Sequence, residues 1–348
     1  MELKELMYEL PRSLIAATPA PDRASARLMV VDKASGVISH SDFSSLGRFL
    51  RAGDVLVLND TRVFPARLRG RKESGGKAEL LLVEPFPHWP NLWIAVIDAA
   101  KPPQVGGRIF FSPDAYAEII GAMGRGRYGV KFHHAGDFDD LLGKFGEPPI
   151  PPYVQQERGN ERVAPLDWER YQTVYARESG AVAAPTAGFH FTPELLAGLE
   201  SKGIGTAFLT LHVGPGTFTP VREEKVENHR MEGERYTLRS DEAEKIKRAK
   251  ASGNRVVAVG STSTRALEWI AQKKGAVEAD EGLARLFIRP GFSFRVLDGL
   301  ITNFHLPGST PLVLVAAFAG MDLIRRAYQE AIREQYRFYS YGDAMLIL

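Results

Sequence analysis

The fold is decided by residues 27–60, RLMVVDKASGVISHSDFSSLGRFLRAGDVLVLND. The apolar runs 27–32 and 54–60 have the composition of buried strands, and 36–40 predicts a further strand after the first of them. Apolar residues recur at helical spacing over 41–53, which predicts a helix. Strands that alternate with a helix in this way indicate an α/β fold.

A different pattern follows from Arg67 to Phe145. Glycine, proline and charged residues separate short β-like runs: ARLRGRK (66–72), AELLLVE (78–84), LWIAVIDAA (92–100), RIFFS (108–112) and RYGVKFHH (127–134). Closely spaced short strands are typical of a small barrel or sandwich. A short helix is predicted over 137–145, and GEPPIPPYV (146–154) predicts an extended crossing, because X-Pro bonds favour extended backbone.

The α/β pattern then returns and continues to the end of the sequence. Predicted helices open at Pro165, Thr192 and Ser240, and predicted buried strands lie at 205–213 and 255–260. Further helices are expected over 267–274 and 321–335. The simplest architecture is an α/β main domain with a mixed sheet, formed by residues 1–66 and 149–348, with a β-rich module, a small barrel or sandwich, inserted at 67–148.

Composition excludes several kinds of chemistry. The 348 residues include no cysteine, so disulfides, thiolate zinc sites, cysteine-ligated iron–sulfur clusters and a cysteine nucleophile are ruled out. The net charge of +2 means that a nucleic-acid partner would need a local basic patch. The longest apolar run, 311–321, is shorter than the roughly 20 residues that span a bilayer, so we expect a cytoplasmic protein with no membrane partner.

Five polar loops that contain glycine or proline follow predicted strands. Ligands of α/β sheets bind beyond the carboxyl ends of the strands, so the five loops predict one shared site, although each alone could be an ordinary turn. Three of the eight histidines lie in these loops, and a fourth, His229, follows closely. The loops are NDTRVFPARL (59–68), AAPTAGFHFTPE (183–194), TLHVGPGTFTPV (210–221), VGSTSTRALEW (259–269) and LITNFHLPGSTPL (300–312).

The loop VGSTSTRALEW predicts an anion site at the start of a helix. A helix that begins near Ser263 would direct its first N–H groups at an anion, and Arg265 could hold a carboxylate or phosphate in two bonds. The alternative is a simple helix cap provided by Ser263 or Thr262. Other motifs fail: GRGRYG (124–129) precedes a predicted strand instead of a helix, and His133 and His134 lack the spacing of a metal site, so no metal is expected.

Basic residues gather at the start of the predicted barrel. They make RNA contact there a hypothesis, with a solvated surface as the alternative. The predicted tRNA-binding residues are Arg67, Arg69, Arg71 and Lys72.

Several segments resemble the S-adenosylmethionine:tRNA ribosyltransferase-isomerase family of queuosine biosynthesis. The resemblance rests on NDTRVFPARL, PPY, ERYQTVYA, AAPTAGFHFT, LHVGPGTF, STSTRALE, ITNFHLPGST and YRFYSYGDAMLI, which occur in order along the whole chain. It is weakest in the inserted module, and it departs at Glu232, where the family often has a second histidine, whereas His229 and Glu234 keep the pattern.

The resemblance implies an α/β domain with an inserted barrel and a specific reaction. The ribosyl part of S-adenosylmethionine would be transferred to, and isomerised on, 7-aminomethyl-7-deazaguanine at the wobble position of tRNA, giving epoxyqueuosine-tRNA, adenine and methionine. S-adenosylmethionine would be a substrate, and no prosthetic group is implied. We expect a monomer, with an oligomer left open.

This reaction needs a base for the methylene beside the sulfonium, an acid for the departing adenine and an unprotonated substrate amine. The candidate proton-transfer residues are His190, His212, His305 and Glu234, with Asp60 and Asp343 as secondary candidates. The candidate substrate-binding residues are Asn59, Arg62, Thr186, Phe189, Gly214, Gly216, Thr217, Phe218, His229, Thr262, Ser263, Arg265, Asn303 and Tyr341. Two alternatives are another S-adenosylmethionine-dependent tRNA-modifying enzyme, such as a methyltransferase, and a non-catalytic RNA-binding protein.

Overall fold

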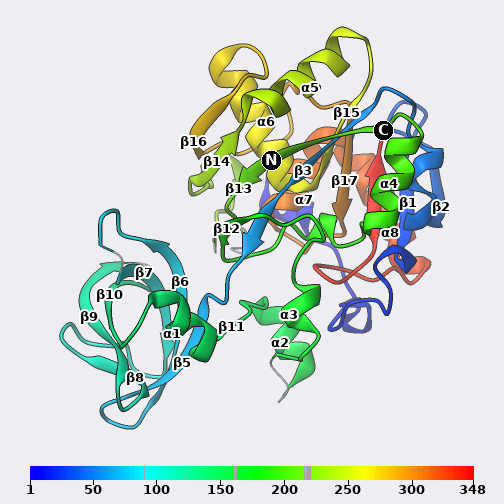
Figure 1. The fold of residues 1–348 in the computed structure, drawn as a ribbon. Coiled ribbons are helices and arrows are strands. Elements are labelled where there is room, and N and C mark those ends of the chain that lie inside the picture. Colours follow the sequence, from blue (N-terminus) through cyan, green and yellow to red (C-terminus); the bar gives the residue numbers. More distant parts are fainter. Residues whose placement is uncertain (90, 125, 160–162, 215, 217–220) are drawn as a thin grey trace.

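The computed structural model describes residues 1–89, 91–124, 126–159, 163–214, 216 and 221–348. Its helices are α1 (Phe138–Phe145), α2 (Pro152–Arg158), α3 (Asp167–Arg170), α4 (Pro193–Ser201), α5 (Ser240–Ala251), α6 (Gly260–Lys274), α7 (Thr310–Ala319) and α8 (Met321–Arg333). The chain forms a large main sheet and a separate barrel, which lie side by side in Figure 1.

The main sheet is mixed and has the strand order β16-β14-β13-β3-β15-β17-β18-β1-β2. Four neighbouring strands, β13, β3, β15 and β17, run parallel to one another, whereas β18 runs antiparallel to β17. The strands of this sheet are β1 (Arg27–Val31), β2 (Ile38–Asp42), β3 (Val55–Asn59), β13 (Gly205–Leu211), β14 (Glu234–Leu238), β15 (Val256–Val259), β16 (Asp280–Ala284), β17 (Gly299–Asn303) and β18 (Ala344–Ile347).

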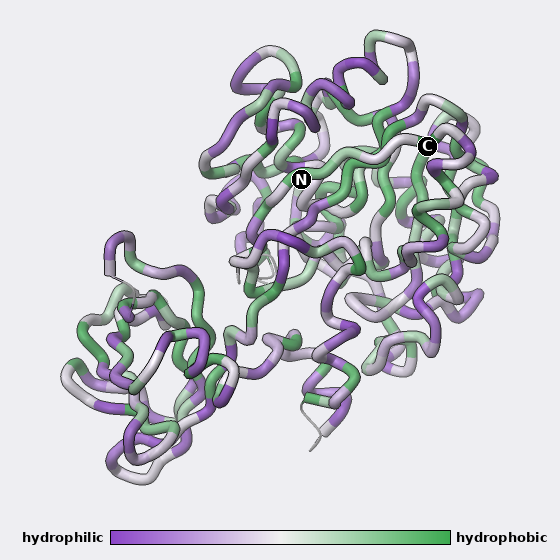
Figure 2. The backbone as a smooth tube through the Cα atoms, in the orientation of Figure 1, coloured by the Kyte–Doolittle hydropathy of each residue, from purple (hydrophilic) through white to green (hydrophobic). Residues whose placement is uncertain are grey.

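Both faces of the main sheet are covered, which explains why its central strands are apolar throughout. In β3, Val55 and Val57 pack in a core with residues of α5, α6, α7 and α8. The alternate residues Leu56 and Leu58 pack on the other face with Phe43, Leu46 and residues of α4. Figure 2 shows the resulting hydrophobic colouring along the central strands.

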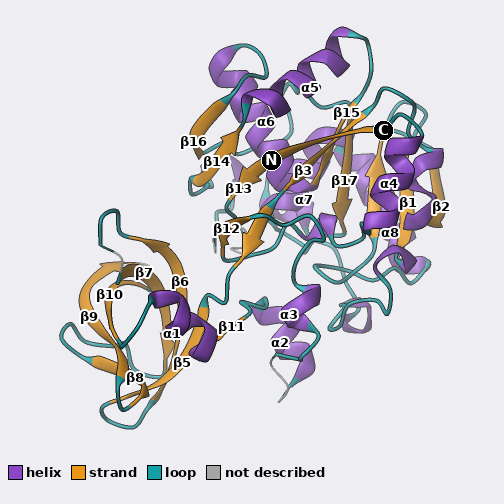
Figure 3. Cartoon of the chain, viewed as in Figure 1, coloured by secondary structure: helices purple, strands orange, loops and turns teal. Residues whose placement is uncertain are grey.

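The barrel closes because β5 pairs with both β6 and β8. Its six antiparallel strands follow the order β5-β6-β7-β10-β9-β8, and the short β11 (Gly146–Glu147) adds to β5. In Figure 3, α1 lies against these strands. The six strands are β5 (Arg67–Lys72), β6 (Lys77–Pro85), β7 (Leu92–Ala99), β8 (Arg108–Ser112), β9 (Ala115–Gly124) and β10 (Arg127–His133).

The predicted fold class, a mixed α/β sheet with an inserted barrel, is confirmed, while the domain boundaries at 67 and 148 stay a prediction. The helix expected from Pro165 is wrong beyond α3. The Gln172 side chain accepts a bond from Val63 N at 3.0 Å and donates to Val63 O at 2.7 Å, which holds this segment beside β4 (Thr61–Val63). The chain then enters β12 (Glu178–Ala181), which pairs with β4.

Two other expected segments differ in detail. The helix predicted over 41–53 is a 3₁₀ helix, Phe43–Arg48, in which Phe43 and Leu46 share the buried side at the spacing that this helix places on one face. The proline-rich crossing contains α2, because Pro152 occupies its first turn, where proline is tolerated.

Candidate functional site

The carboxyl ends of the four parallel strands meet at one edge of the main sheet. β3 ends at Asn59, β13 leads into His212, β15 leads into Gly260, and β17 ends at Asn303. Four of the five polar loops in the sequence therefore lie side by side, as expected for a ligand site of an α/β sheet.

A cavity of about 290 Å³ opens at this edge, and we call it the strand-end cavity. The first turns of α6 and α7 line it, so their unpaired backbone N–H groups favour an anion. Its lining residues are Tyr153, Ala184–Ala187, Val213, Gly260–Thr262, Thr302–Pro307, Ser309, Pro311, Tyr339 and Ser340.

A chain of hydrogen bonds fixes the polar wall of the strand-end cavity. Thr186 Oγ1 donates to Asn303 Oδ1 at 2.8 Å, and Asn303 Nδ2 lies 3.4 Å from His190 Nε2. Burial lowers the pKa of His190 to about 3, with nearby Arg23 contributing, so the imidazole is neutral and can accept this bond. His190 thus bonds to Asn303 but does not line the strand-end cavity; it lines a small separate cavity instead.

His305 lies on the strand-end cavity itself. Its Nε2 is 2.7 Å from Thr302 Oγ1, and its backbone N–H donates to the Tyr328 hydroxyl at 2.9 Å. Burial lowers the pKa of His305 to about 3, so this ring is also neutral at pH 7.

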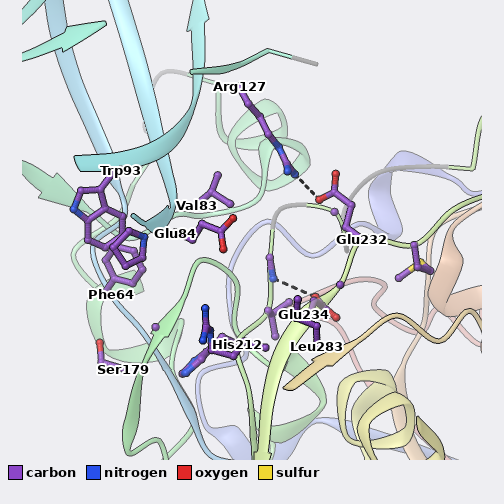
Figure 4. A pocket seen from close by; sticks show the side chains of 18 of the residues that line it. Phe64, Val83, Glu84, Trp93, Arg127, Ser179, His212, Glu232, Glu234 and Leu283 are labelled. Carbon is purple, nitrogen blue, oxygen red and sulfur yellow. Dashed lines mark hydrogen bonds and ion pairs between the residues drawn. The ribbon is translucent and has the colours of Figure 1, made fainter. Parts of the chain in front are cut away.

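A second cavity of about 720 Å³ separates the barrel from the main sheet, and we call it the interdomain cleft (Figure 4). Val213 lines both cavities, so they adjoin. The barrel side is formed by Phe64, Val83, Glu84, Pro85, Trp93, Arg127, Phe138, Asp139 and Leu142. The main-sheet side is formed by Ser179, Gly180, His212–Gly214, Gly216, Met231–Arg235, Leu283 and Arg285.

His212 projects from the end of β13 into the interdomain cleft (Figure 4). Its Nδ1 is 2.8 Å from Thr61 Oγ1, which fixes the ring orientation. Burial lowers the pKa of His212, and the positive charge of Arg235 lowers it further, which favours the neutral base form. Gly180 lies under the ring: a Cβ there would be 2.8 Å from His212 Cε1, and its φ of +151° also favours glycine.

Glu234 links the cleft to α6. Its Oε1 accepts a bond from Gly214 N at 3.1 Å, and its Oε2 pairs with Arg265. Arg265 also donates to Leu286 O at 3.0 Å and is buried. In this structure the guanidinium of Arg265 is bonded to a carboxylate and a carbonyl of the protein, and its predicted anion-binding role stays a prediction.

The helix expected near Ser263 begins earlier, at Gly260. Ser263 lies inside its first turns and donates its hydroxyl to Val259 O at 2.9 Å, so it neither caps the helix nor faces a cavity. Thr262 does line the strand-end cavity, and its Oγ1 is 3.3 Å from Asn59 Nδ2.

Three predicted polar residues bond to other groups of the protein and line neither the strand-end cavity nor the interdomain cleft. Asn59 bonds the backbone N–H and carbonyl of Leu211, both at 2.9 Å. Asp60 accepts from Thr210 Oγ1 at 2.7 Å and pairs with Arg177 at 3.0 Å. Asp343 accepts backbone N–H bonds from Arg27 at 3.0 Å and Arg337 at 2.7 Å, although burial raises its pKa.

The predicted aromatic ligands have different positions. Phe189 and Tyr341 stack at 6.0 Å, and the Tyr341 hydroxyl donates to Asp167 at 2.7 Å; both belong to a core cluster and line neither the strand-end cavity nor the interdomain cleft. Gly214 and Gly216 line the interdomain cleft. Thr217 and Phe218 lie outside the described residues.

Arg62 and His229 line neither the strand-end cavity nor the interdomain cleft. Arg62 is exposed on β4, and His229 Nδ1 lies 3.1 Å from Glu223 Oε2.

Two of the predicted RNA-binding arginines, Arg67 and Arg69, already form ion pairs with glutamates of the protein. Arg67 is buried, pairs with Glu79 at 2.9 Å and donates to Ile150 O at 2.9 Å. Arg69 pairs with Glu79 and with Glu147, so the side chains that neutralise both arginines come from the protein itself.

Arg71 and Lys72 donate to carbonyls of the barrel, Gly75 O at 3.1 Å and Lys101 O at 3.0 Å. Their role in RNA binding stays a prediction.

Sequence reasoning missed several residues of the cleft. Thr61 and Gly180 orient His212, but only Thr61 belongs to a motif noticed in the sequence, NDTRVFPARL. Trp93 lies on a barrel strand that matches no motif, and Arg127 lies in GRGRYG, which the strand after it excludes as a dinucleotide site, so the fold alone brings both to the cleft that His212 lines.

Two features are absent from the described ranges. Within them, no three His, Asp or Glu residues are grouped so that they could hold a metal ion. The helices of the same ranges include none with the length and apolar character needed to cross a membrane.

A mixed α/β sheet with a cavity at its strand ends has the architecture of the α/β proteins that bind ligands at this edge. The chain belongs to the queuosine biosynthesis protein family, whose model matches residues 3–347. The predicted family is thereby confirmed, as is the prediction of an enzyme of the transferase and isomerase class.

Individual relatives match along their whole length. Proteins named S-adenosylmethionine:tRNA ribosyltransferase-isomerase from Thermoanaerobacter sp. (strain X514) and Trichlorobacter lovleyi are 45% and 48% identical, with 100% of each chain covered. The crystal structure of an S-adenosylmethionine tRNA ribosyltransferase from Thermotoga maritima is similar with a TM-score of 0.56 and 35% identity, covering 99% of this chain and 100% of that one.

Proposed function

We propose that this enzyme transfers the ribosyl part of S-adenosylmethionine to 7-aminomethyl-7-deazaguanine at the wobble position of tRNA and isomerises it. The products are epoxyqueuosine-tRNA, adenine and methionine. The observation that carries the proposal is the pair of adjoining cavities, one at strand ends and one between domains, that share Val213. Two substrates of very different size can thus meet at one boundary, and the names of the relatives agree with this pairing.

S-adenosylmethionine occupies the strand-end cavity in this proposal. The methionine carboxylate binds the first turns of α6 and α7, where backbone N–H groups and the positive end of the helix dipole favour an anion. Thr186, Thr262 and Asn303 provide hydroxyl and amide groups for the ribose or the carboxylate.

The modified base enters the interdomain cleft. Phe64 and Trp93 offer aromatic surface on the barrel side, which suits stacking of a base turned out of its strand. The cleft is more than twice the volume of the strand-end cavity, at about 720 against 290 Å³, and it is bounded by charged side chains that suit a polar substrate.

His212 is the proposed proton acceptor. The positive sulfur of S-adenosylmethionine acidifies the adjacent methylene, and removal of that proton leaves an ylide. His212 adjoins Val213 at the boundary of the cavities and is held neutral by burial, so it can take this proton near pH 7. His305, in the strand-end cavity, is the proposed partner of the departing adenine, while His190 positions Asn303.

Product analysis tests the proposal. The enzyme is incubated with S-adenosylmethionine and an anticodon stem-loop that carries the aminomethyl base, and the products are separated by mass spectrometry. We expect adenine and methionine in equal amounts with the modified RNA. Release of S-adenosylhomocysteine without adenine would instead identify a methyltransferase, and binding of RNA without any turnover would identify a non-catalytic RNA-binding protein.

A further inference from the structure

Among the described residues, three arginines line the interdomain cleft and come from both of its sides. Arg127 begins β10 of the barrel, Arg235 lies on β14, and Arg285 follows β16. Leu283 on β16 is exposed; it pairs with Arg235 across the two strands and precedes Arg285 by two residues. We call these three arginines the cleft arginines.

Arg127 reaches across the cleft and forms an ion pair with Glu232 (Figure 4). This pair connects the barrel to the segment that precedes β14. The side chains keep 27% and 36% of their exposure, so water and ions reach the contact and another anion can replace the carboxylate. The Glu232 carboxylate also lies against Gly216, 3.2 Å from where a Cβ would be.

The other two cleft arginines are exposed and have no such partner. Among the residues that the structure describes, neither Arg235 nor Arg285 forms an ion pair. The Arg285 side chain lies against Gly233, with Cγ 3.1 Å from a Cβ built there, so it is held beside Glu232. In β5, by contrast, Arg67 and Arg69 are neutralised by Glu79 and Glu147.

Acidic residues restrict where a polyanion can bind. Glu84 and Asp139 line the barrel side of the same cleft, so the cleft as a whole is not strongly positive. Attraction for a phosphate is therefore local to the cleft arginines, where a guanidinium can hold two phosphate oxygens in parallel bonds.

We propose that the cleft arginines bind backbone phosphates of the RNA on either side of the target base, and that an RNA phosphate displaces Glu232 from Arg127. This inference rests on the proposed function, because it takes RNA as the second substrate. Glu232 then acts as an internal competitor, which holds Arg127 across the cleft until RNA arrives. The competition lowers RNA affinity, so removal of the Glu232 charge strengthens binding.

Opposite effects of the two partners test the proposal. The dissociation constant of the anticodon stem-loop is measured at several salt concentrations for R127Q, E232Q and the double variant. We expect about tenfold weaker binding in R127Q, with a salt slope shallower by about one unit. E232Q is expected to bind about threefold more tightly, and the double variant to behave as R127Q.

A matched control lies on α5, where Arg248 and Glu244 form a surface pair 3.9 Å apart. R248Q and E244Q are expected to leave RNA affinity unchanged. If R127Q and E232Q weaken RNA binding equally, with S-adenosylmethionine affinity retained, the pair is only a structural link and the proposal is overturned. R285Q provides a second route: it should weaken RNA binding and flatten the salt slope without breaking any ion pair, and an unchanged slope would remove Arg285 from the RNA contact.

Failure of the proposed function gives a different result. Opposite shifts in R127Q and E232Q, combined with no release of adenine by the unaltered enzyme, would support the RNA contact and refute the ribosyl transfer. Normal release of adenine, combined with unaltered RNA affinity in R127Q, E232Q and R285Q, would refute the RNA contact alone.

Discussion

The strand-end cavity and the interdomain cleft differ in what builds them. The strand-end cavity is formed by backbone at the ends of β15 and β17, by two helix N-termini and by a connected set of buried hydrogen bonds. The interdomain cleft is formed by charged and aromatic side chains from two separate sheets. The first is preorganised for a small ligand, whereas the second depends on how the barrel lies against the main sheet.

The largest expected effect concerns the boundary of the two cavities. H212N should lower kcat/KM at least about 100-fold, because general-base catalysis contributes about 10²- to 10⁴-fold, while S-adenosylmethionine affinity is retained. The measurement is adenine release under single-turnover conditions. Full activity of H212N, together with loss of activity in H305N, would move the proton acceptor into the strand-end cavity.

The orientation of His212 can be tested separately through Thr61. T61V removes the hydroxyl that lies 2.8 Å from Nδ1, whereas T61S keeps it. We expect T61V to lower kcat about tenfold and to shift the acidic limb of the pH profile, and T61S to restore both. Equal losses in T61V and T61S would mean that packing of the Thr61 methyl group, and not the hydroxyl, supports the site.

The strand-end cavity should respond through S-adenosylmethionine affinity. N303A leaves the Thr186 hydroxyl and His190 without their shared partner, and a lost buried hydrogen bond costs about 1–3 kcal/mol. We expect the dissociation constant of S-adenosylmethionine to rise about tenfold, measured by calorimetry, with RNA affinity unchanged. A change in RNA affinity alone would reverse the assignment of the two cavities.

Low pH should reduce the stability of the folded chain through His190, which bonds to Asn303 in the wall of the strand-end cavity. His190 has a pKa near 3 in the folded chain and about 6.5 when unfolded, so the unfolded state binds the extra proton first. Its contribution to stability is complete above about pH 6.5 and is lost as the pH falls toward 3. The free energy of unfolding, measured with urea from pH 7 to pH 5, should fall as the pH falls. H190Q should reduce that slope by up to about 1.4 kcal/mol per pH unit. An identical dependence in H190Q would mean that this ring is not held neutral.

The smallest effect is expected on the outer face of the barrel. R71A and K72A remove side chains that bond only to barrel carbonyls in the described structure. If the cleft arginines are the main phosphate contacts, RNA affinity should change less than about twofold in each variant, since surface charges far from the contact are screened. A loss of RNA affinity as large as that of R127Q would show that Arg71 or Lys72 contacts the RNA.

Much of the fold could be predicted because it depends on local patterns. The apolar runs that become β3, β13 and β15 are continuous, as strands covered on both faces must be. The short strands of 67–133 likewise predicted a small barrel or sandwich, and the pairing of β5 with β8 makes it a barrel.

The sites were harder to predict because partners are distant in sequence. The sequence suggested that Arg67 and Arg265 could bind a ligand. In the fold, Arg67 forms an ion pair with Glu79, and Arg265 forms one with Glu234. Conversely, nothing in the sequence around Arg127 or Trp93 places either in the cleft that His212 lines, since only the packing of the barrel against the main sheet does so.

The position of β18 has a consequence for synthesis of the chain. β18 lies between β17 and β1, so the N-terminal strands β1 and β2 join the main sheet only through residues 344–347. On a translating ribosome, the β1–β2 pair must therefore wait while roughly 300 further residues are added, which takes about 15–60 s at 5–20 residues per second. The barrel, whose strands are contiguous in sequence, can fold well before that, so a stalled ribosome would carry a finished barrel and an open main sheet.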